Sequence, residues 1–122
     1  MSRISGNTGE SFASEYLQKK GYKIIARNFY SRYGEIDLIA QKNEDTICFV
    51  EVKTRREGSM TSGEEAVTLS KQRKIIKTAL IWLQAESCNM QPSFDICVVI
   101  TKGGVPISCE LLEAAFDGSA YA

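Results

Sequence analysis

Residues 34–55 constrain the fold of this chain more than any other stretch. They read GEIDLIA, then the polar hexapeptide QKNEDT, then ICFVEVKTR. Two runs rich in apolar residues around a polar connection are typical of a β-hairpin. The near-continuous apolar stretch ICFVEV predicts that the second strand is covered on both faces. Asp37, Glu51 and Lys53 nevertheless lie within these runs, so the hairpin carries charge in the middle of an apolar context.

The register of this hairpin predicts which charged side chains meet. If the turn is centred on Glu44, paired positions sum to twice 44, and Asp37 lies opposite Glu51. The same register sets Glu35 opposite Lys53. Facing carboxylates repel one another unless a cation lies between them, and Mg²⁺ takes carboxylate oxygens while keeping several waters, one of which Lys53 is near enough to polarise. The alternative is an amphipathic hairpin with a solvated charged face, but the covered second strand favours a site.

Side-chain alternation also predicts the faces of the two strands. In the second strand Glu51 and Lys53 share a face with apolar residues that precede them. In the first strand Asp37 shares a face with Glu35 and Ile39. The opposite face of the first strand is expected to carry its other apolar residues, namely Ile36, Leu38 and Ala40.

Composition limits the class of protein. An apolar fraction of 43% and a charged fraction of 25% are ordinary for one globular domain covering residues 1–122. The formal net charge is zero, so a nucleic-acid site would have to be a local basic patch. The chain has no histidine, which excludes an imidazole base, and its four scattered cysteines show no zinc-binding spacing. The polar N-terminus and the lack of a long apolar run predict a cytoplasmic protein with no membrane partner.

The first helix is expected over residues 8–20, with Asn7 as its N-cap and Gly21 as its stop. Glu10 stands three residues after Asn7 and borders the apolar stripe. It can therefore close a capping box or reach a site on the sheet, and both interpretations stay open.

The second helix is expected over residues 68–86, with Thr68 as its N-cap. Its apolar stripe comprises Ile75, Ile76, Ala79, Leu80 and Leu83. Gln72 extends this stripe toward the N-terminus and aims a polar group at the sheet. The first turns also carry four cations and no acid, namely Lys71, Arg73, Lys74 and Lys77. Cations at this end oppose the helix dipole, so the cluster is either a phosphate-binding edge or a solvated helix face.

Three further strands are predicted at residues 22–30, 94–101 and 105–112, the last two joined by a Gly-Gly turn. The element order is then helix, three strands, helix, two strands. Asp95 is interpreted as a turn or capping residue, and the tail from Glu113 is expected to fray. The loop at residues 57–63 is a candidate lid beside the site. Four arginines near strand ends pair either with phosphates or with neighbouring acids, namely Arg27, Arg32, Arg55 and Arg56.

A glutamate on the first helix, an aspartate on one strand and Glu-x-Lys on the next resemble the PD-(D/E)xK restriction-endonuclease-like superfamily. More closely, the chain resembles the YraN-like family of small bacterial proteins. The matching residues span nearly the whole chain and include the blocks GEIDLIA at residues 34–40 and FVEVKTR at residues 49–55. One departure is Leu69-Ser70, which stands where the second helix often begins with a proline.

The resemblance implies an α/β fold with a restriction-endonuclease-like mixed sheet of about five strands flanked by helices. It also implies a Mg²⁺-dependent nuclease, with Mn²⁺ as a substitute, and distant kinship with archaeal Holliday-junction resolvases. By position, Asp37, Glu51 and the backbone carbonyl of Val52 would bind the metal. Lys53 would orient the attacking water, and Glu10 would complete the acidic cluster. Gln72 or Lys71 would occupy an assisting position on the second helix.

The resulting expectation is a nuclease that hydrolyses DNA phosphodiester bonds, including those of branched or structured DNA. DNA-binding residues are expected around the site, namely Arg27, Arg55, Lys71, Arg73 and Lys74. By analogy, a homodimer would present two sites to one branched substrate. The alternative is a non-catalytic nucleic-acid-binding or adaptor module that retains the nuclease fold. A third alternative is a nuclease that acts on RNA.

Overall fold

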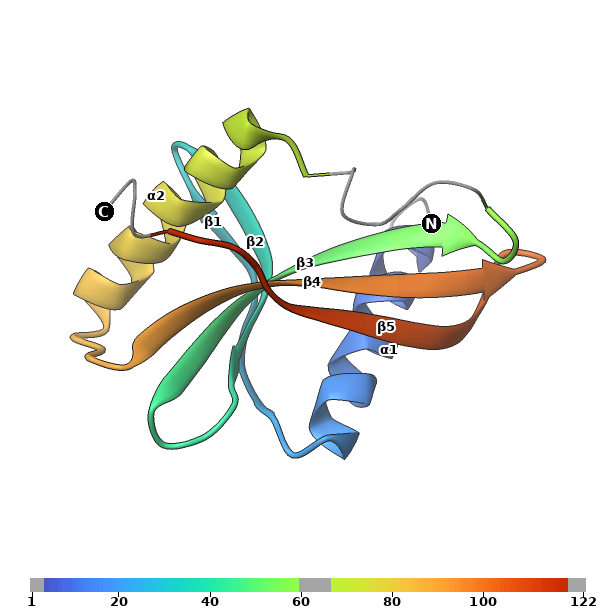
Figure 1. The fold of residues 1–122 in the computed structure, drawn as a ribbon, viewed down its shortest axis with the longest axis horizontal. Coiled ribbons are helices and arrows are strands. Elements are labelled where there is room, and N and C mark those ends of the chain that lie inside the picture. The colour runs from blue at the N-terminus through green and yellow to red at the C-terminus, as the bar shows by residue number, and fades with distance from the viewer. Residues whose placement is uncertain (1–3, 60–66, 119–122) are drawn as a thin grey trace.

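The computed structural model describes residues 4–59 and 67–118 of the 122-residue chain. They form two helices and five strands in the predicted α-β-β-β-α-β-β order. The elements are α1 (Ile4–Lys19), β1 (Lys23–Ser31), β2 (Gly34–Gln41), β3 (Thr46–Arg56), α2 (Leu69–Ala85), β4 (Gln91–Lys102) and β5 (Val105–Phe116). The strands lie in the order β1-β2-β3-β4-β5, with β3 and β4 parallel and the other neighbours antiparallel (Figure 1). The predicted α/β fold with a mixed sheet is confirmed.

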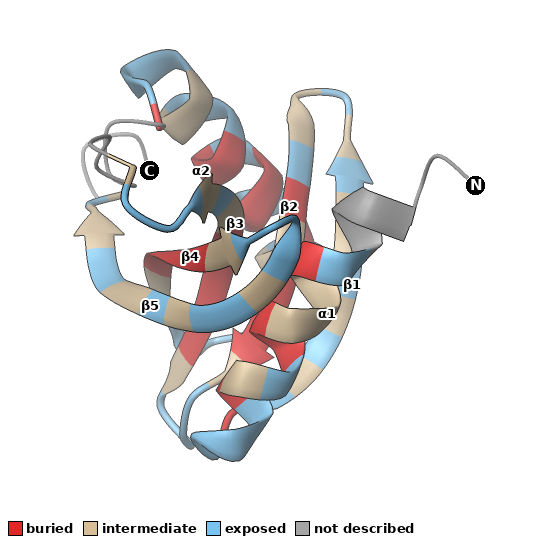
Figure 2. Cartoon of the chain, turned by 90° about the vertical axis from the view of Figure 1, so that its right-hand side faces the viewer, coloured by how far each residue is buried: buried red, intermediate tan, exposed pale blue. Residues whose placement is uncertain are grey.

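The two helices cover opposite faces of this twisted sheet. Phe49 and Ile47 of β3 pack toward α2 with Ile76 and Trp82, whereas Val50 packs toward α1. The α1 side of the core is completed by Ala13, Leu17, Tyr22, Leu38, Ala40, Cys48, Cys97 and Val99. Figure 2 shows the buried residues gathered on the strands and on the helix surfaces that face them. The prediction of a second hairpin strand covered on both faces is therefore confirmed.

The helix ends follow local rules with one exception. Gly21 adopts φ 97°, and Tyr22 N–H donates to the Leu17 carbonyl at 3.0 Å, which closes α1 as a Schellman motif. Thr68 caps α2 by accepting a hydrogen bond from Lys71 N–H at 3.2 Å, as predicted. However, α1 begins at Ile4 rather than at residue 8. Asn7 therefore lies within the helix, and the capping-box interpretation of Glu10 is wrong.

The alternation predicted for β2 fails at one position. Leu38 packs on the α1 side of the sheet, but Ile36 packs on the α2 side with Ile39. The neighbouring strand explains the switch, because Asn28 of β1 adopts φ 53° and has no partner in a register that otherwise pairs Arg27 with Leu38 and Phe29 with Ile36. A left-handed residue inside a strand breaks the alternation of faces. The break lies beside Asp37.

The second half of the chain differs from the predictions in three places. β4 begins at Gln91, so Asp95 lies within a strand and is 1% exposed, and its interpretation as a turn or cap is wrong. β5 continues to Phe116, which pairs with Phe94, so the stretch from Glu113 to Phe116 belongs to a strand rather than to a frayed tail. In α2 Leu80 is 40% exposed, so its expected place in the core stripe is wrong, and Trp82, which was not predicted there, belongs to the core.

The predicted lid at residues 57–63 lies largely outside the described residues. Only its first part, residues 57–59, is described. There Glu57 N–H donates to the Thr101 carbonyl and Ser59 N–H to the Arg56 carbonyl, which ends β3 in a turn. No helix within residues 4–59 and 67–118 is both long and apolar enough to cross a lipid bilayer.

Candidate active site

The site begins where the backbone ladder between β2 and β3 ends. Their paired residues run from Gln41 opposite Ile47 to Leu38 opposite Val50, which is the register predicted from the sequence. At the next position a side chain replaces the backbone as hydrogen-bond acceptor. The Oδ2 atom of Asp37 accepts the Val52 N–H at 2.8 Å. The sheet therefore continues here through the Asp37 carboxyl group.

The Val52 carbonyl points toward β2, as the Val52 N–H does. The N–H and C=O groups of one strand residue point to the same side of the strand. Since the Val52 N–H points toward Asp37, its carbonyl also points toward the β2 side, beyond the end of the paired ladder. This geometry makes the carbonyl oxygen available beside the two acidic side chains.

Asp37 and Glu51 form a carboxyl pair. The Glu51 side chain is 4% exposed, and its carboxyl group interacts with that of Asp37. Burial, hydrogen bonding to Glu51 and the charge of Glu51 together raise the pKa of Asp37 from 3.8 to about 8. The hydrogen bond from Val52 N–H works in the opposite direction but is outweighed. At neutral pH the pair therefore retains a proton, which a bound cation can replace.

Two lysines neutralise Glu51 from different elements. Lys53 Nζ lies 3.6 Å from Glu51 Oε2 along β3, and Lys71 Nζ from the first turn of α2 forms an ion pair with the same oxygen atom. Burial and the nearby Lys71 ammonium lower the pKa of Lys53. Burial lowers the pKa of Lys71. The hydrogen bond to Glu51 and the charge of Glu51 outweigh burial, so the pKa of Lys71 is raised. Lys53 is thus the more readily deprotonated of the two amines.

Glu10 approaches from the α1 side of the sheet. Its charge contributes to the raised pKa of Asp37, and its Oε1 atom is buried with no hydrogen-bond partner among the described residues. Arg27 Nη2 lies 3.9 Å from that atom. Gly9 permits this approach, because a Cβ atom at its position would lie 3.0 Å from Thr54 Cγ2 on β3. A buried carboxylate oxygen without a donor is suited to a cation.

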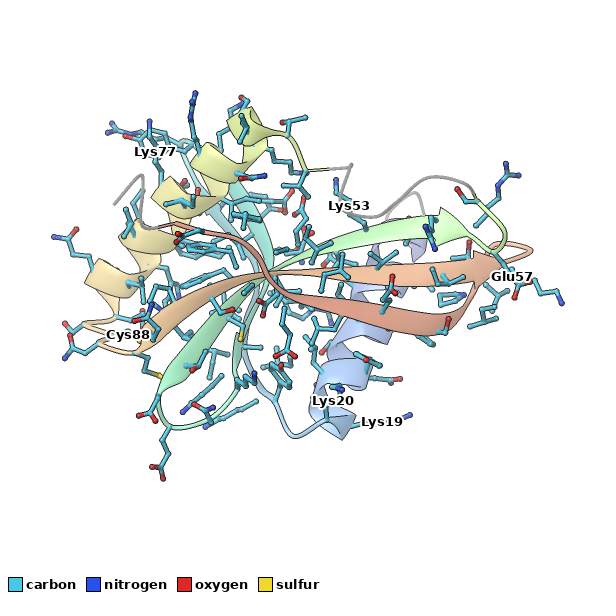
Figure 3. The ribbon with its side chains drawn as sticks, viewed as in Figure 1. Lys19, Lys20, Lys53, Glu57, Lys77 and Cys88 are labelled. Carbon is cyan, nitrogen blue, oxygen red and sulfur yellow. The ribbon has the colours of Figure 1, made fainter. Side chains whose placement is uncertain are left out.

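A cavity of about 340 Å³ opens over these groups. Its lining comprises Gly34, Glu35, Asp37, Glu51, Val52, Lys53, Lys71, Lys74 and Ile75. The lining is drawn from β2, β3 and α2, which are separated in the sequence. Figure 3 shows the Lys53 side chain above β3, on the side of the sheet where α2 begins. The cavity gives solvent and a ligand access to the carboxyl pair.

The residues fit a hard divalent cation. Within the described part of the chain, no three acidic, cysteine or histidine side chains are gathered closely enough to enclose a metal on their own. Mg²⁺ does not require such a cage, since it is commonly bound by one or two carboxylates, waters and substrate phosphate. Asp37, Glu51 and the Val52 carbonyl supply that partial set of oxygens, while Glu10, whose Oε1 atom lacks a hydrogen-bond donor, acts on Asp37 from outside the cavity lining.

The structure brings some of the predicted site residues together and leaves others apart. Asp37, Glu51, Val52 and Lys53 line the cavity, as do Lys71 and Lys74, which were assigned to DNA binding. Glu35 and Lys53 also share this lining, although the described ladder does not pair them.

Gln72 lies outside the cavity lining, and its side-chain amide donates to the Val67 carbonyl at 3.3 Å. Arg73 is exposed on α2, and Arg55 lies further along β3, both outside the lining. Arg27 lies on the α1 side of the sheet and donates to Ser11 Oγ at 3.3 Å. Of the two candidate residues on α2, Lys71 therefore contacts Glu51, whereas Gln72 contacts the Val67 carbonyl. Sequence spacing does not distinguish Lys71 from Gln72, because which of them reaches Glu51 depends on how α2 docks on the sheet.

Comparison with known proteins places the chain in a family. A relative from Syntrophomonas wolfei, called a UPF0102 protein, is 46% identical over 85% of this chain and 90% of its own length. UPF0102 proteins from Vibrio campbellii and Caldanaerobacter subterraneus are 44% and 48% identical over 83% and 77% of this chain, and over 84% and 77% of their own lengths. Residues 9–99 match the family described as "Uncharacterised protein family UPF0102". The chain therefore belongs to the UPF0102 family, which is the YraN-like family that its sequence motifs resemble.

Proposed function

We propose that this protein is a metal-dependent nuclease that hydrolyses DNA phosphodiester bonds. The observation that carries the proposal is the Asp37–Glu51 carboxyl pair, with Glu51 buried and Asp37 half-buried, in the lining of an open cavity. Two carboxyl groups held against each other are unfavourable in the folded protein unless a proton or a cation lies between them. Lys53, Lys71 and Lys74 also line the cavity, which suits a substrate that carries negative charge.

The proposed roles follow from position. Asp37, Glu51 and the Val52 carbonyl would hold the metal, with Mn²⁺ able to replace Mg²⁺. When bound, the metal would supply charge stabilisation at the scissile phosphate. Lys53 would orient the attacking water and stabilise charge on the phosphorane-like transition state. Lys71 holds Glu51 and adds positive charge where the phosphorane-like transition state becomes more negative.

A second candidate is a nucleic-acid-binding or adaptor module that does not cleave. The ion pairs of Glu51 with Lys53 and Lys71 favour it, because they neutralise Glu51 without any metal and the pair with Lys71 ties β3 to α2. In such a module the three side chains would serve folding. In a nuclease their loss would stop cleavage in a protein that remains folded, so activity and stability must be measured together.

The decisive experiment measures cleavage of labelled linear, single-stranded, flapped and four-way-junction DNA, with Mg²⁺ or Mn²⁺. Wild type is compared with Glu51→Ala and Lys53→Ala, and single-stranded RNA is included to test the alternative substrate. Glu113→Ala and Lys42→Ala serve as matched controls, because they remove an exposed ion pair of 2.6 Å outside the site. Thermal unfolding of every variant verifies the fold.

We expect cleavage by wild type and both controls, and a loss of at least about 100-fold in Glu51→Ala and Lys53→Ala. DNA binding without cleavage, unchanged in all four variants, would contradict the nuclease and favour the adaptor. Cleavage confined to RNA would retain the chemistry and replace the substrate.

A further inference from the structure

A basic patch borders the candidate site on one side. It is formed by Arg32 and Tyr33 in the turn between β1 and β2 and by Lys74 and Lys77 of α2. Lys74 also lines the cavity, and Gly34, directly after Tyr33, lines it as well. A Cβ atom at Gly34 would lie 3.7 Å from Lys74 Cβ, so the turn packs directly on the helix. The patch is therefore continuous with the cavity.

The turn is fixed on α2 by side-chain contacts. Ser31 Oγ and Thr78 Oγ1 lie 2.7 Å apart, and Thr78 is fully buried. The Tyr33 N–H donates to Ser31 Oγ at 3.1 Å. These contacts hold the Tyr33 backbone against the helix between Lys74 and Lys77.

The Tyr33 ring orders two of the cations. The guanidinium carbon of Arg32 and the Nζ atom of Lys77 each lie 5.0 Å from the centroid of this ring. Arg32 Nη2 also donates to the Tyr33 hydroxyl at 2.9 Å. Cations held in place by an aromatic ring lose less conformational freedom on binding an anion than freely moving ones. Both side chains remain exposed, so their charge is available to a ligand.

The composition of α2 adds positive charge to this surface. Its 17 residues include four cations and no acid. Lys71, Lys74 and Lys77 rise together about 9 Å along the helix at 1.5 Å per residue. One strand of B-DNA carries a phosphate about every 3.4 Å of its axis, so this length matches about three phosphates.

We propose that the patch formed by Arg32, Tyr33, Lys74 and Lys77 binds the phosphate backbone of DNA that extends from the candidate active site. This inference rests on the proposed function for the position of the scissile phosphate. It adds that the protein recognises a polynucleotide strand over several phosphates on the α2 side. A single diester at the end of a chain would leave the patch without a ligand.

The test measures binding of a short labelled DNA duplex by fluorescence anisotropy in EDTA over a range of salt concentrations. The double variant Arg32→Ala/Lys77→Ala is compared with the control Lys19→Ala/Lys20→Ala. The control removes the same charge at the C-terminal end of α1, where Lys20 lies 5.5 Å from the centroid of the Tyr16 ring. Figure 3 shows Lys77 beside α2 and the two control lysines at the opposite edge of the molecule.

We expect the patch variant to bind at least about tenfold more weakly, with the salt slope reduced by about one for each cation removed. The control should bind like wild type. Tyr33→Leu keeps both charges, so we expect weaker binding with an unchanged salt slope. Equal losses in patch and control variants, or no binding of DNA by wild type, would overturn the proposal.

Hydrolysis of bis(p-nitrophenyl) phosphate separates this inference from the nuclease itself. The patch variant should hydrolyse this small diester at the wild-type rate while its KM for DNA rises. If wild type cleaves DNA and the patch variant has an unchanged KM, the patch is wrong and the nuclease stands. If wild type hydrolyses neither substrate but binds DNA through the patch, the nuclease is wrong and the patch stands.

Discussion

Two aspartates in the same sheet have similar backbone settings and different surroundings. Asp37 accepts the Val52 N–H at 2.8 Å where the β2–β3 ladder ends. Asp95 accepts the Ala114 N–H at the same distance, beside a register shift between β4 and β5. Asp95 also accepts the Ser93 hydroxyl at 2.7 Å and is 1% exposed. Asp37 instead meets a second carboxyl group at the floor of a cavity.

The difference shows how a buried carboxyl group can be assigned to structure or to chemistry. A carboxylate surrounded by neutral donors is satisfied and stabilises the strands that it joins. A carboxyl group pressed against another acid is satisfied only through a shared proton or a cation, and its environment favours ligand binding. Asp95 belongs to the first kind. Asp37 has the features of the second.

Asp95→Ala tests the structural side of this comparison and carries the largest expected effect on stability. It leaves the Ala114 N–H and the Ser93 hydroxyl without their acceptor inside the sheet. We expect the free energy of unfolding to fall by about 1–3 kcal/mol, measured by urea denaturation. Metal affinity per folded molecule should not change. Stability equal to that of wild type would show that Asp95 is not the structural member of the pair.

The pH dependence of stability tests the Asp37 side. The folded protein keeps the Asp37 proton to a pH of about 8, whereas the carboxyl loses it near 3.8 in the unfolded chain. Between these values Asp37 binds more protons in the folded state than in the unfolded one, so its contribution to the free energy of unfolding falls as pH rises. We expect metal-free wild type to be more stable at acidic pH than above pH 8, which thermal unfolding in EDTA measures.

Asp37→Asn is the matched variant for this measurement. It removes the titrating group, so we expect a stability gain on the order of 1 kcal/mol above the Asp37 pKa and a flatter pH profile. Mg²⁺ should raise the unfolding temperature of wild type there and leave the variant unchanged. A variant that is less stable than wild type throughout this range would contradict the repulsive pair.

The smallest effect on stability and cleavage is expected at Gln72, which the sequence analysis assigned to the site but which lies outside the cavity lining. Gln72 contacts the Val67 carbonyl, so Gln72→Ala should change stability by no more than about 0.5 kcal/mol and leave cleavage intact. Lys71→Ala, at the adjacent position, removes an ion pair with Glu51 and should lower the cleavage rate about tenfold. The reverse order in a cleavage assay would return the assisting role to Gln72.

Much of the site could be predicted because it depends on local rules. The hairpin register follows from a polar turn of fixed length between apolar runs, and the observed Leu38–Val50 pair obeys it. The same register brings Asp37 near Glu51, and strand alternation brings Lys53 near Glu51. Thr68 and Gly21 mark helix ends by hydrogen bonds to residues close in the sequence.

Other features depended on contacts between distant segments. The face of Ile36 was predicted wrongly because the left-handed Asn28 lies on a different strand. Asp95 was misplaced because its acceptor role depends on Ala114, which is 19 residues away.

The sequence by itself determined the element order, the register of the central hairpin and the meeting of two carboxyl groups, since periodicity and turn length specify them. Only the tertiary structure decided that Lys71 rather than Gln72 reaches Glu51, and that Glu10 faces the sheet instead of capping its helix. It also decided that Tyr33 lies beside Lys77. These contacts depend on where each helix docks on a twisted sheet, and docking is set by the packing of the whole core rather than by neighbours in the chain.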